Sequence, residues 1–472
     1  MVGLPVDRPA APVEPSPPGA ARRSSQRGPV TSRSIAAPGS STCSPLSAGG
    51  AYPAQSLPWE SALHPATIGG NEPASSGRAV EEVALHVLHV VPTDLARGAQ
   101  VYARALVDSA NRVAGDEHEI AVLFAGRRVA VFAEHELGVP SGRLHAAGLD
   151  PRAVWRLWRL VRRTRPDVIV AHGAESLKYA VFARGRNRQV VCHSIGVVSA
   201  KAQQGTSHAL HRALLGRADL VIAVSNAVAQ QLHDLFGVGW DRLQVIPNGR
   251  DPSAFAGAPH APGDADPVLL FVGHLTATKR PEVFVEVVSV LRGRGCPVDA
   301  VMVGDGPLED TLAQPAAAAG VALLGRRIDV ASFLSAADVF LFPSIAEGEG
   351  MPGVLIEAGL AGVPVVATDV PGVRDVVVDR ETGRVIPVED VAGLADAAEE
   401  LLRAPVLRAA MGASARARCE RLFSLGACTA RWVEELSRLA AAPRPRRRVR
   451  ALGGAVRPLG TRESSSLSRA DE

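Results

Sequence analysis

The stretch PSIAEGEGMPGVLIEAGLAGVPVVATD, residues 343–369, combines the end of one strand, a glycine-rich loop, a helix and a second strand. The strand that enters it, DVFLFP (338–343), and the strand near its end, VPVVAT (363–368), are almost continuously apolar. Apolar strands separated by a helix are typical of parallel sheets whose two faces are both covered by helices. The stretch therefore predicts an α/β domain with a doubly wound sheet.

The same alternation of strands and helices extends through most of the chain, in two series. In the first series we expect strands at 83–91, 119–124, 167–172, 189–194, 219–225 and 243–247, with helices at 99–113, 151–165, 174–184, 206–216 and 225–236. In the second series we expect strands at 267–273, 298–304, 321–325, 338–343 and 363–368, with helices near 281–293, 307–319, 329–336, 353–361, 390–402 and 405–419.

Two series predict two doubly wound, Rossmann-like domains with a ligand cleft between them. The first covers residues 83–255, the second covers 267–422, and residues 256–266 form the linker. A further helix is expected over 423–440, and whether it crosses back to the first domain stays open.

Both ends of the chain lack the hydrophobic periodicity of a folded domain. Residues 1–82 are rich in Pro, Ser, Ala and Gly, and residues 441–472 contain eight arginines and three acidic residues. Segments of this composition bury too little apolar surface to offset the entropy of ordering, so we expect both to be disordered. The net charge is only +3, with its positive excess in the C-terminal tail, which argues against a nucleic-acid-binding domain.

Several classes of protein are excluded by simple counts. No window approaches the ~18 consecutive apolar residues of a membrane-spanning helix, and the first residues lack the apolar core of a secretory signal. The five cysteines show no CxxC spacing, so we expect neither a disulfide framework nor a structural zinc site. Asp264 and Asp266 resemble a metal-binding DxD motif, but a solvated turn in the linker accounts for them. We therefore expect a cytoplasmic protein.

Charged residues gather where strands of the second domain are expected to end, which is where sheets of this kind bind ligands. Lys279 follows one such strand, and a cation there can neutralise a departing phosphate without a metal. The helix that begins near Gly353 offers free amide N–H groups to a diphosphate. Glu349 and Glu357 can accept hydrogen bonds from sugar hydroxyls. Together these residues predict a site for a sugar nucleotide.

The glycines of the same loop have a competing interpretation. Gly348, Gly350 and Gly353 satisfy GxGxxG, the pattern of dinucleotide-binding folds. However, Glu347 and Glu349 would place two negative charges where a pyrophosphate binds, which disfavours a dinucleotide site.

The stretch 343–369 resembles the signature of family-4 glycosyltransferases of GT-B architecture, which has a serine, an EG pair, seven residues between two glutamates, and GxPVVA. The residues that match are Ser344, Glu349, Gly350, Glu357, Gly362, Pro364 and Val365. The neighbouring FVGHL, VGDGP and VPGVRDVV match the family's order and spacing, and the resemblance covers roughly residues 83–440.

This resemblance implies a GT-B fold and a retaining glycosyltransferase. The reaction it implies moves a sugar, which we expect to be a hexose, from a nucleoside diphosphate sugar to an acceptor. The acceptor classes that it leaves open are lipid-linked molecules, polysaccharides and small glycosides. It implies no metal and no other cofactor.

The chain departs from the family's pattern in places. His274 stands where the family has an arginine beside the donor phosphates. Arg97 replaces the first glycine of the family's GGxE/Q loop and could supply the charge that His274 lacks. Asp375 stands where glutamate is more common. The segment EGEG leaves open whether Glu347 or Glu349 is the first signature glutamate, and spacing favours Glu349.

The resemblance also implies roles for individual residues. It assigns Lys279 and Glu349 to catalysis, together with His172, which lies on the sugar and acceptor side, and it places His193 on that side too. The residues expected to bind the donor are Arg97, Gly98, His274, Lys279, Gly304, Asp305, Gly306, Gly325, Arg326, Gly350, Met351, Pro352, Gly353 and Glu357.

The segment PRAVWRLWRLVRRTR (151–165) predicts a basic helix that carries Trp155 and Trp158. Such a helix can lie on an anionic membrane surface, and the alternative is an ordinary surface helix with its apolar stripe packed on the sheet. Contact with the inner face of the membrane therefore stays open. Two other functions also stay open on this architecture: a sugar-nucleotide epimerase and a non-catalytic nucleotide-sugar-binding protein.

Overall fold

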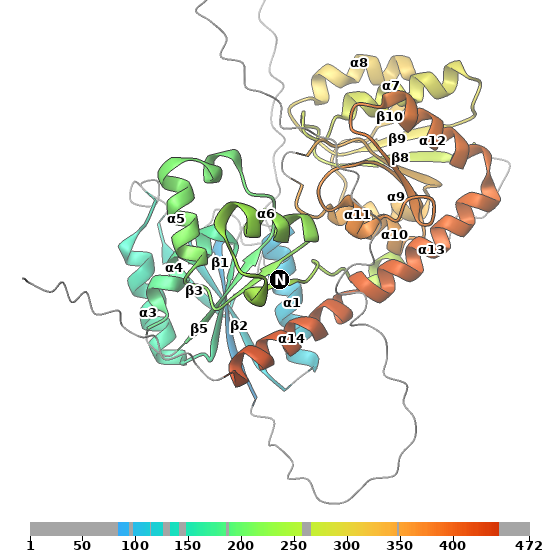
Figure 1. The fold of residues 1–472 in the computed structure, drawn as a ribbon. Coiled ribbons are helices and arrows are strands. Elements are labelled where there is room, and N and C mark those ends of the chain that lie inside the picture. Colours follow the sequence, from blue (N-terminus) through green and yellow to red (C-terminus); the bar gives the residue numbers. More distant parts are fainter. Residues whose placement is uncertain are drawn as a thin grey trace, which may run out of the picture. The chain divides into compact units, whose positions relative to one another are not determined.

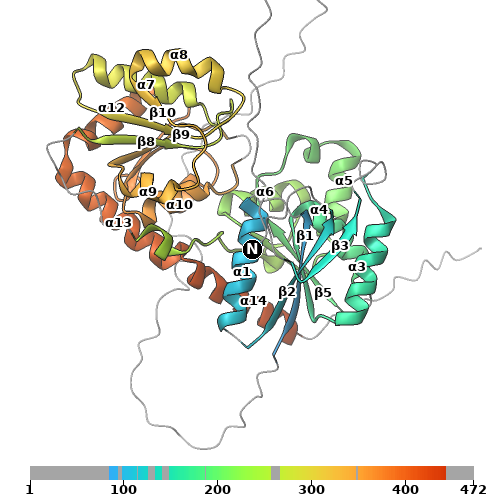
Figure 2. The same cartoon turned by 180° about the vertical axis from the view of Figure 1, so that it is seen from behind.

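The computed structural model describes residues 84–93, 98–113, 115–125, 133–140, 148–185, 188–256, 266–346 and 349–442. They form two parallel sheets with covering helices (Figures 1 and 2). Residues 1–82 and nearly all of 441–472, for which we predicted disorder, lie outside the described residues. Arg97, Glu347, Gly348 and Asp264 also lie outside them.

The first sheet has seven parallel strands in the order β3-β2-β1-β4-β5-β6-β7. Its strands are β1 (His86–Thr93), β2 (Glu117–Phe124), β3 (His135–Val139), β4 (Val168–His172), β5 (Gln189–Ser194), β6 (Leu220–Ala223) and β7 (Leu243–Val245). From central β1 the chain proceeds to one edge through β2 and β3, and then to the other through β4 to β7. This is the doubly wound order that the sequence predicts.

Helices cover both faces of this sheet. The helices that alternate with its strands are α1 (Gly98–Val113), α3 (Pro151–Thr164), α4 (Gly173–Ala183), α5 (Gly205–Leu215) and α6 (Asn226–Phe236). Short 3-10 helices lie at Ala200–Gln203, Trp240–Arg242 and Pro252–Phe255. On one face, Leu157 of α3 and Leu177 of α4 share a core with Leu88 of β1.

The other face is covered by α1 and by the last helix, α14 (Leu425–Ala441). Cys428, Trp432 and Leu436 recur every four residues, so they form one apolar stripe along α14. That stripe shares a core with Val170 of β4 and with Tyr102 of α1. The helix that we expected near the C-terminus therefore packs on the first sheet.

The second sheet has six parallel strands in the order β10-β9-β8-β11-β12-β13. Its strands are β8 (Val268–Val272), β9 (Asp299–Val303), β10 (Val321–Leu323), β11 (Val339–Phe342), β12 (Val365–Thr368) and β13 (Gly383–Ile386). Its helices are α7 (Pro281–Gly293), α8 (Glu309–Ala319), α9 (Val330–Ser335), α10 (Gly353–Leu360), α11 (Val373–Val376), α12 (Val391–Arg403) and α13 (Pro405–Phe423).

Two edge strands, β3 and β13, are absent from the sequence-based assignment. The first reads HELGV and the second GRVI, so neither is a continuous apolar run. An edge strand has only one neighbour, and its side chains are less buried than those of a central strand, which weakens the hydrophobic signal.

In the part of the chain that the structure describes, no helix is long and apolar enough to span a membrane.

Candidate functional site

The loops at the carboxyl ends of β8 and β11 bring together Lys279 and Glu349, two residues that the sequence nominates for catalysis. The Lys279 ammonium forms an ion pair with Oε1 of Glu349. Only 9% of the Glu349 side chain and 26% of the Lys279 side chain is exposed. The Lys279 Nζ also lies 5.1 Å from the centre of the Phe342 ring, which adds a cation–π contact. The Lys279 ammonium is thus fixed between the carboxylate of Glu349 and the ring of Phe342.

Glu357 lies on α10, and its partner is a residue that the sequence analysis did not nominate. The Arg250 Nε donates to Oε1 of Glu357 over 2.7 Å. The Arg250 backbone is fixed as well, since its N–H donates to the carbonyl of Phe423 and its carbonyl accepts from the N–H of Leu425. A Cβ on Gly353 would lie 2.0 Å from Nη2 of Arg250, so the first turn of α10 packs directly on this guanidinium.

The segment between these two pairs, residues 350–353, carries several predicted donor-binding residues. The Gly350 carbonyl accepts a hydrogen bond from Oγ of Ser225, which caps α6, over 2.6 Å. Met351 packs against the core of the first sheet. Pro352 precedes α10 and provides no side-chain cap for the helix. The amide groups of the first turn are therefore not engaged by a capping side chain.

The GDGP turn packs on the loop that follows β8. Gly304 and Gly306 have φ values of 148° and 157°, which side chains with a Cβ rarely adopt. A Cβ on Gly304 would lie 1.8 Å from the carbonyl oxygen of Gly273, so glycine is also required for this close approach. Nδ1 of His274 lies 2.6 Å from the carbonyl oxygen of Asp305 in the same turn. The His274 side chain is 62% exposed and the Asp305 side chain is 50% exposed.

Two remaining donor-binding candidates follow β10. The Gly325 carbonyl accepts from the N–H of Gly304, which ties this turn to GDGP over 2.9 Å. Arg326 is exposed. On the first sheet, Gly98 is the first residue of α1 and is exposed, whereas Arg97 lies outside the described residues.

His172 and His193 lie side by side at the carboxyl ends of β4 and β5. Their Nδ1 atoms are 2.9 Å apart, and both rings are buried beneath Trp432 of α14. Nε2 of His172 is also in contact, 3.0 Å from Nδ1 of His89. Burial lowers the pKa of His172 to about 3, so the ring is neutral at neutral pH. Both ring nitrogens of His172 are therefore engaged inside the protein.

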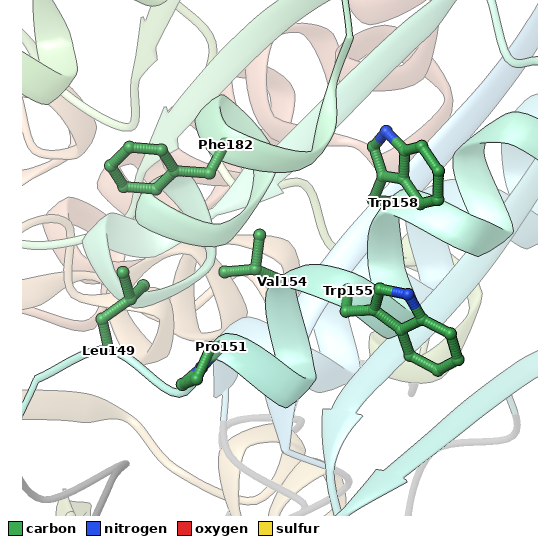
Figure 3. A pocket seen from close by; sticks show the side chains of 6 residues that line it. All are labelled: Leu149, Pro151, Val154, Trp155, Trp158 and Phe182. Carbon is green, nitrogen blue, oxygen red and sulfur yellow. The ribbon is translucent and has the colours of Figure 1, made fainter.

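A shallow apolar pocket of about 430 Å³ lies away from these residues, on the outer surface of the first sheet's helices. It is lined by Leu149, Pro151, Val154, Trp155, Trp158 and Phe182, and Figure 3 shows these side chains around it. Trp155 is 54% exposed and Phe182 is 53% exposed.

Arginines of α3 lie beside the two tryptophans of this pocket. The guanidinium of Arg159 lies over the ring of Trp155, and that of Arg162 lies over the ring of Trp158. Arg152 pairs with Asp150, which caps the helix. The surface therefore combines exposed aromatic rings with several cations.

Two family models together match most of the described chain. Residues 96–254 match the model described as Glycosyltransferase Family 4, and residues 266–404 match the model described as Glycosyl transferases group 1. The chain belongs to the family-4 glycosyltransferases. The resemblance that the signature around Glu349 and Glu357 suggests is thereby confirmed.

Curated relatives of this family-4 chain include two actinobacterial enzymes. A D-inositol 3-phosphate glycosyltransferase of Nocardia farcinica is 29% identical, over 52% of this chain and 54% of the relative. A phosphatidyl-myo-inositol mannosyltransferase of Mycobacterium leprae is 28% identical, over 68% of this chain and 84% of the relative. The chain thus spans only about half of the length of the Nocardia relative.

Solved structures confirm the predicted GT-B architecture. Anabaena HepE in complex with UDP and glucose has a TM-score of 0.61 and 22% identity, over 75% of this chain and 99% of HepE. A sucrose-phosphate synthase from Thermosynechococcus elongatus has a TM-score of 0.62 and 22% identity, over 76% of this chain and 99% of the synthase. At this level of identity the similarity concerns the fold.

Proposed function

We propose that this family-4 chain transfers a hexose from a nucleoside diphosphate sugar to an acceptor hydroxyl, with retention of the anomeric configuration. The observation that carries the proposal is the pair of contacts at the two ends of residues 349–357. Glu349 pairs with Lys279 at one end, and Glu357 pairs with Arg250 at the other. Two cations and two hydroxyl-binding carboxylates thus lie along one short segment, whose helix also begins there.

In the proposed reaction, the bond between the anomeric carbon and the diphosphate oxygen breaks, and a bond from that carbon to the acceptor oxygen forms. The diphosphate leaves with the electron pair and takes up the proton of the acceptor hydroxyl. Lys279 and Arg250 stabilise the developing negative charge, together with the uncapped amides of α10. Because these groups are already cationic, we propose that the charge is neutralised by the protein without a metal.

The two carboxylates hold the neutral parts of the donor. Glu357 accepts hydrogen bonds from the ribose hydroxyls, and Glu349 accepts from the hydroxyls of the transferred sugar. The turns at Gly304–Gly306 and Gly325 lie next to each other and present backbone groups to the nucleoside. On the acceptor side we place His172 and His193 at the carboxyl ends of β4 and β5.

The first experiment measures donor binding by the full chain with UDP, GDP and ADP and their hexose conjugates, followed by release of the nucleoside diphosphate. A Lys279→Met variant is expected to lower diphosphate affinity roughly 30-fold or more, because removing one partner of a desolvated charge pair costs at least about 2 kcal/mol. Lys178→Met is the matched control, since Lys178 also forms an ion pair, with Glu175 on α4.

The outcomes separate the alternatives. Release of the diphosphate together with a glycosylated product supports the transferase. Binding without release in any donor and acceptor panel would instead identify a non-catalytic nucleotide-sugar-binding protein. Formation of an epimeric sugar nucleotide would identify an epimerase. The acceptor panel begins with inositol 3-phosphate and phosphatidylinositol, because relatives are named for those acceptors.

We also propose that α3 rests on an anionic membrane surface. Trp155, Trp158 and Phe182 are exposed around the pocket of Figure 3, and arginines stack on both tryptophans. Exposed aromatic rings with adjacent cations favour the interface of an anionic bilayer. Sedimentation with vesicles that contain anionic lipid tests this contact.

The expected result is sedimentation with anionic but not zwitterionic vesicles. A Trp155→Ala, Trp158→Ala double variant should lose it. Trp240→Ala should retain it, because Trp240 is about as exposed as Trp155 but lies away from α3. Equal sedimentation of the double variant and the wild-type protein would refute the proposed contact.

A further inference from the structure

Four buried histidines lie in one line across the first sheet. His118, His89, His172 and His193 belong to the adjacent strands β2, β1, β4 and β5. Val87 pairs with His118, His89 pairs with Val170, and His172 pairs directly with His193. The line therefore rises from the amino end of β2 to the carboxyl end of β5. Only its last two members were nominated from the sequence.

Each histidine contacts the next through ring nitrogens. Nδ1 of His118 lies 3.0 Å from Nε2 of His89. Nδ1 of His89 lies 3.0 Å from Nε2 of His172. Nδ1 of His172 lies 2.9 Å from Nδ1 of His193. Three hydrogen bonds thus connect the four rings.

All four rings are neutral at neutral pH. Burial is the largest cause and lowers the pKa of His118 to about 4 and that of His172 to about 3, and it lowers the pKa values of His89 and His193 as well. A neutral imidazole has one N–H donor and one acceptor nitrogen. If each ring donates at most once and accepts at most once, all three hydrogen bonds must point in the same direction. The chain has therefore only two fully bonded tautomeric arrangements.

The two arrangements differ at the ends of the chain. Nε2 of His118 is buried and has no hydrogen-bond partner among the described residues, but it lies 4.0 Å from Oδ2 of Asp116. The other carboxylate oxygen of Asp116, Oδ1, accepts from the N–H of Leu85 over 2.8 Å. At the far end, Nε2 of His193 is likewise buried and unpartnered within the described part of the chain. The side chain of Asn248 interacts with that ring and raises the pKa of His193, against the larger lowering effect of burial.

In the first arrangement, His118 directs its Nε2–H toward the carboxylate of Asp116, and each following ring donates back toward His118. His193 then carries its proton on Nδ1, and its Nε2 is an acceptor that the Asn248 amide can satisfy after exchanging the positions of its O and N. In the opposite arrangement, the lone pair of His118 Nε2 faces a carboxylate oxygen, which cannot donate. At the His118 end the first arrangement directs an N–H toward the carboxylate 4.0 Å away, whereas the second directs a lone pair at it and is repulsive. At the His193 end the Asn248 amide can donate or accept, so the His118 end decides.

We propose that Asp116 sets the tautomer of His193 through this chain of four imidazoles, with His118 and His89 as positioning residues. The chain leaves Nε2 of His193 as a hydrogen-bond acceptor at the carboxyl end of β5. That the carboxyl end of β5, where this nitrogen meets Asn248, lies on the acceptor side of a glycosyl transfer rests on the proposed function. The tautomer itself does not, and it can be measured in the absence of any substrate.

The experiment is two-bond ¹H–¹⁵N spectroscopy of the full chain with ¹⁵N-labelled histidine, in which protonated and unprotonated ring nitrogens have separate shifts. A His193→Gln spectrum assigns the His193 signals. In the wild-type protein we expect Nδ1 of His193 to be protonated and Nε2 to be unprotonated. In Asp116→Asn, the amide keeps its oxygen toward Leu85 and presents N–H to His118. We expect the chain to reverse, and Nε2 of His193 to become the protonated nitrogen.

Asp167→Asn is the matched control. Asp167 also accepts a backbone N–H at the start of β1, from His86 over 3.1 Å, and it forms no contact with the four rings in the described residues. Its substitution should leave His193 unchanged. A second variant, His118→Asn, keeps an amide at the position of Nδ1 but removes the link to Asp116. It should give a mixture of both tautomers of His193, so a fold defect in Asp116→Asn does not prevent the test.

The proposal is overturned if His193 keeps one tautomer in both Asp116→Asn and His118→Asn, or if the control changes it equally. Turnover is measured on the same samples. Reversal of the tautomer in a protein that transfers no sugar would support the chain and contradict the proposed function. Normal turnover with an unresponsive tautomer would contradict the chain and leave the proposed function intact.

Discussion

Replacement of Asp375 by asparagine is expected to stabilise the protein at neutral pH. Asp375 lies on the short helix α11 and only 6% of it is exposed. One carboxylate oxygen accepts from the side-chain amide of Asn226, on α6 of the first sheet. Burial raises the pKa of Asp375 to about 6, and the hydrogen bonds from Asn226 and the charge of Arg418 oppose it only in part. The ionised carboxylate is thus poorly compensated for its burial.

The magnitude follows from the difference between the folded and unfolded proton affinities. The ordinary pKa of this side chain is 3.8, and the folded value is about 6. At about 1.36 kcal/mol for each pH unit, an ionised Asp375 lowers the free energy of unfolding by roughly 3 kcal/mol relative to the protonated form. Because the folded pKa is the higher one, the stabilisation by the protonated form of Asp375 is fully present below about pH 4 and is lost as the pH rises to about 6.

Asparagine has the same shape, and its oxygen can still accept from Asn226, so Asp375→Asn should gain roughly 1–3 kcal/mol at pH 7.5. The gain should fall to about a third of that value at pH 4.5 and approach zero only below about pH 4. Urea denaturation followed by circular dichroism measures both values, with Asp234→Asn as a control for removal of an exposed carboxylate. An equal loss of stability at both pH values would refute the reasoning, because it would mean that the carboxylate of Asp375 is a net stabilising group.

Three further predictions test other contacts. Gly412→Ala would place a Cβ 2.0 Å from the carbonyl oxygen of Gly362. We expect this substitution to lower the free energy of unfolding by about 1–3 kcal/mol in a denaturant titration. Gly293→Ala should not lower it, because a Cβ there meets nothing within 4 Å. Gly353→Ala should displace the guanidinium of Arg250 and weaken nucleoside diphosphate binding by roughly tenfold in calorimetry, with little change in melting temperature. Burial raises the pKa of the Cys428 thiol to about 12, so this thiol should react with a disulfide reagent only after unfolding, and rapid labelling in the native state would contradict its placement.

Much of the fold is predictable from the sequence because its central strands are buried on both faces. The strands that contain Val170 and Leu341 are almost entirely apolar and lie in the middle of their sheets, where the hydrophobic pattern is strongest. The edge strands β3 and β13 lack that pattern, because each pairs with only one neighbouring strand and its side chains are less buried. The family resemblance is confirmed by both halves of the chain.

The candidate site is predictable only where a motif lies within one segment. Glu349 and Glu357 stand eight residues apart in a recognisable pattern, and Lys279 follows a strand, so each could be nominated. Arg250 could not, since it lies 107 residues before its partner and only the fold brings the two together. The same holds for the line of histidines, in which His89 lies 83 residues before His172. Strand order and register determine such contacts, and neither is visible in a local pattern.

The internal pairing of the site has a consequence for how it can bind an anion. Lys279 and Arg250 are each neutralised by a carboxylate within the protein, so the four charged groups do not repel one another in the folded chain. The proposed function therefore requires an entering diphosphate to exchange with Glu349 and Glu357 rather than add to unpaired cations. The two carboxylates are then free to accept sugar hydroxyls, which are uncharged donors and compete weakly with a cation. A diphosphate joined to sugars at both ends satisfies both requirements at once, whereas a free phosphate would leave the displaced carboxylates without partners.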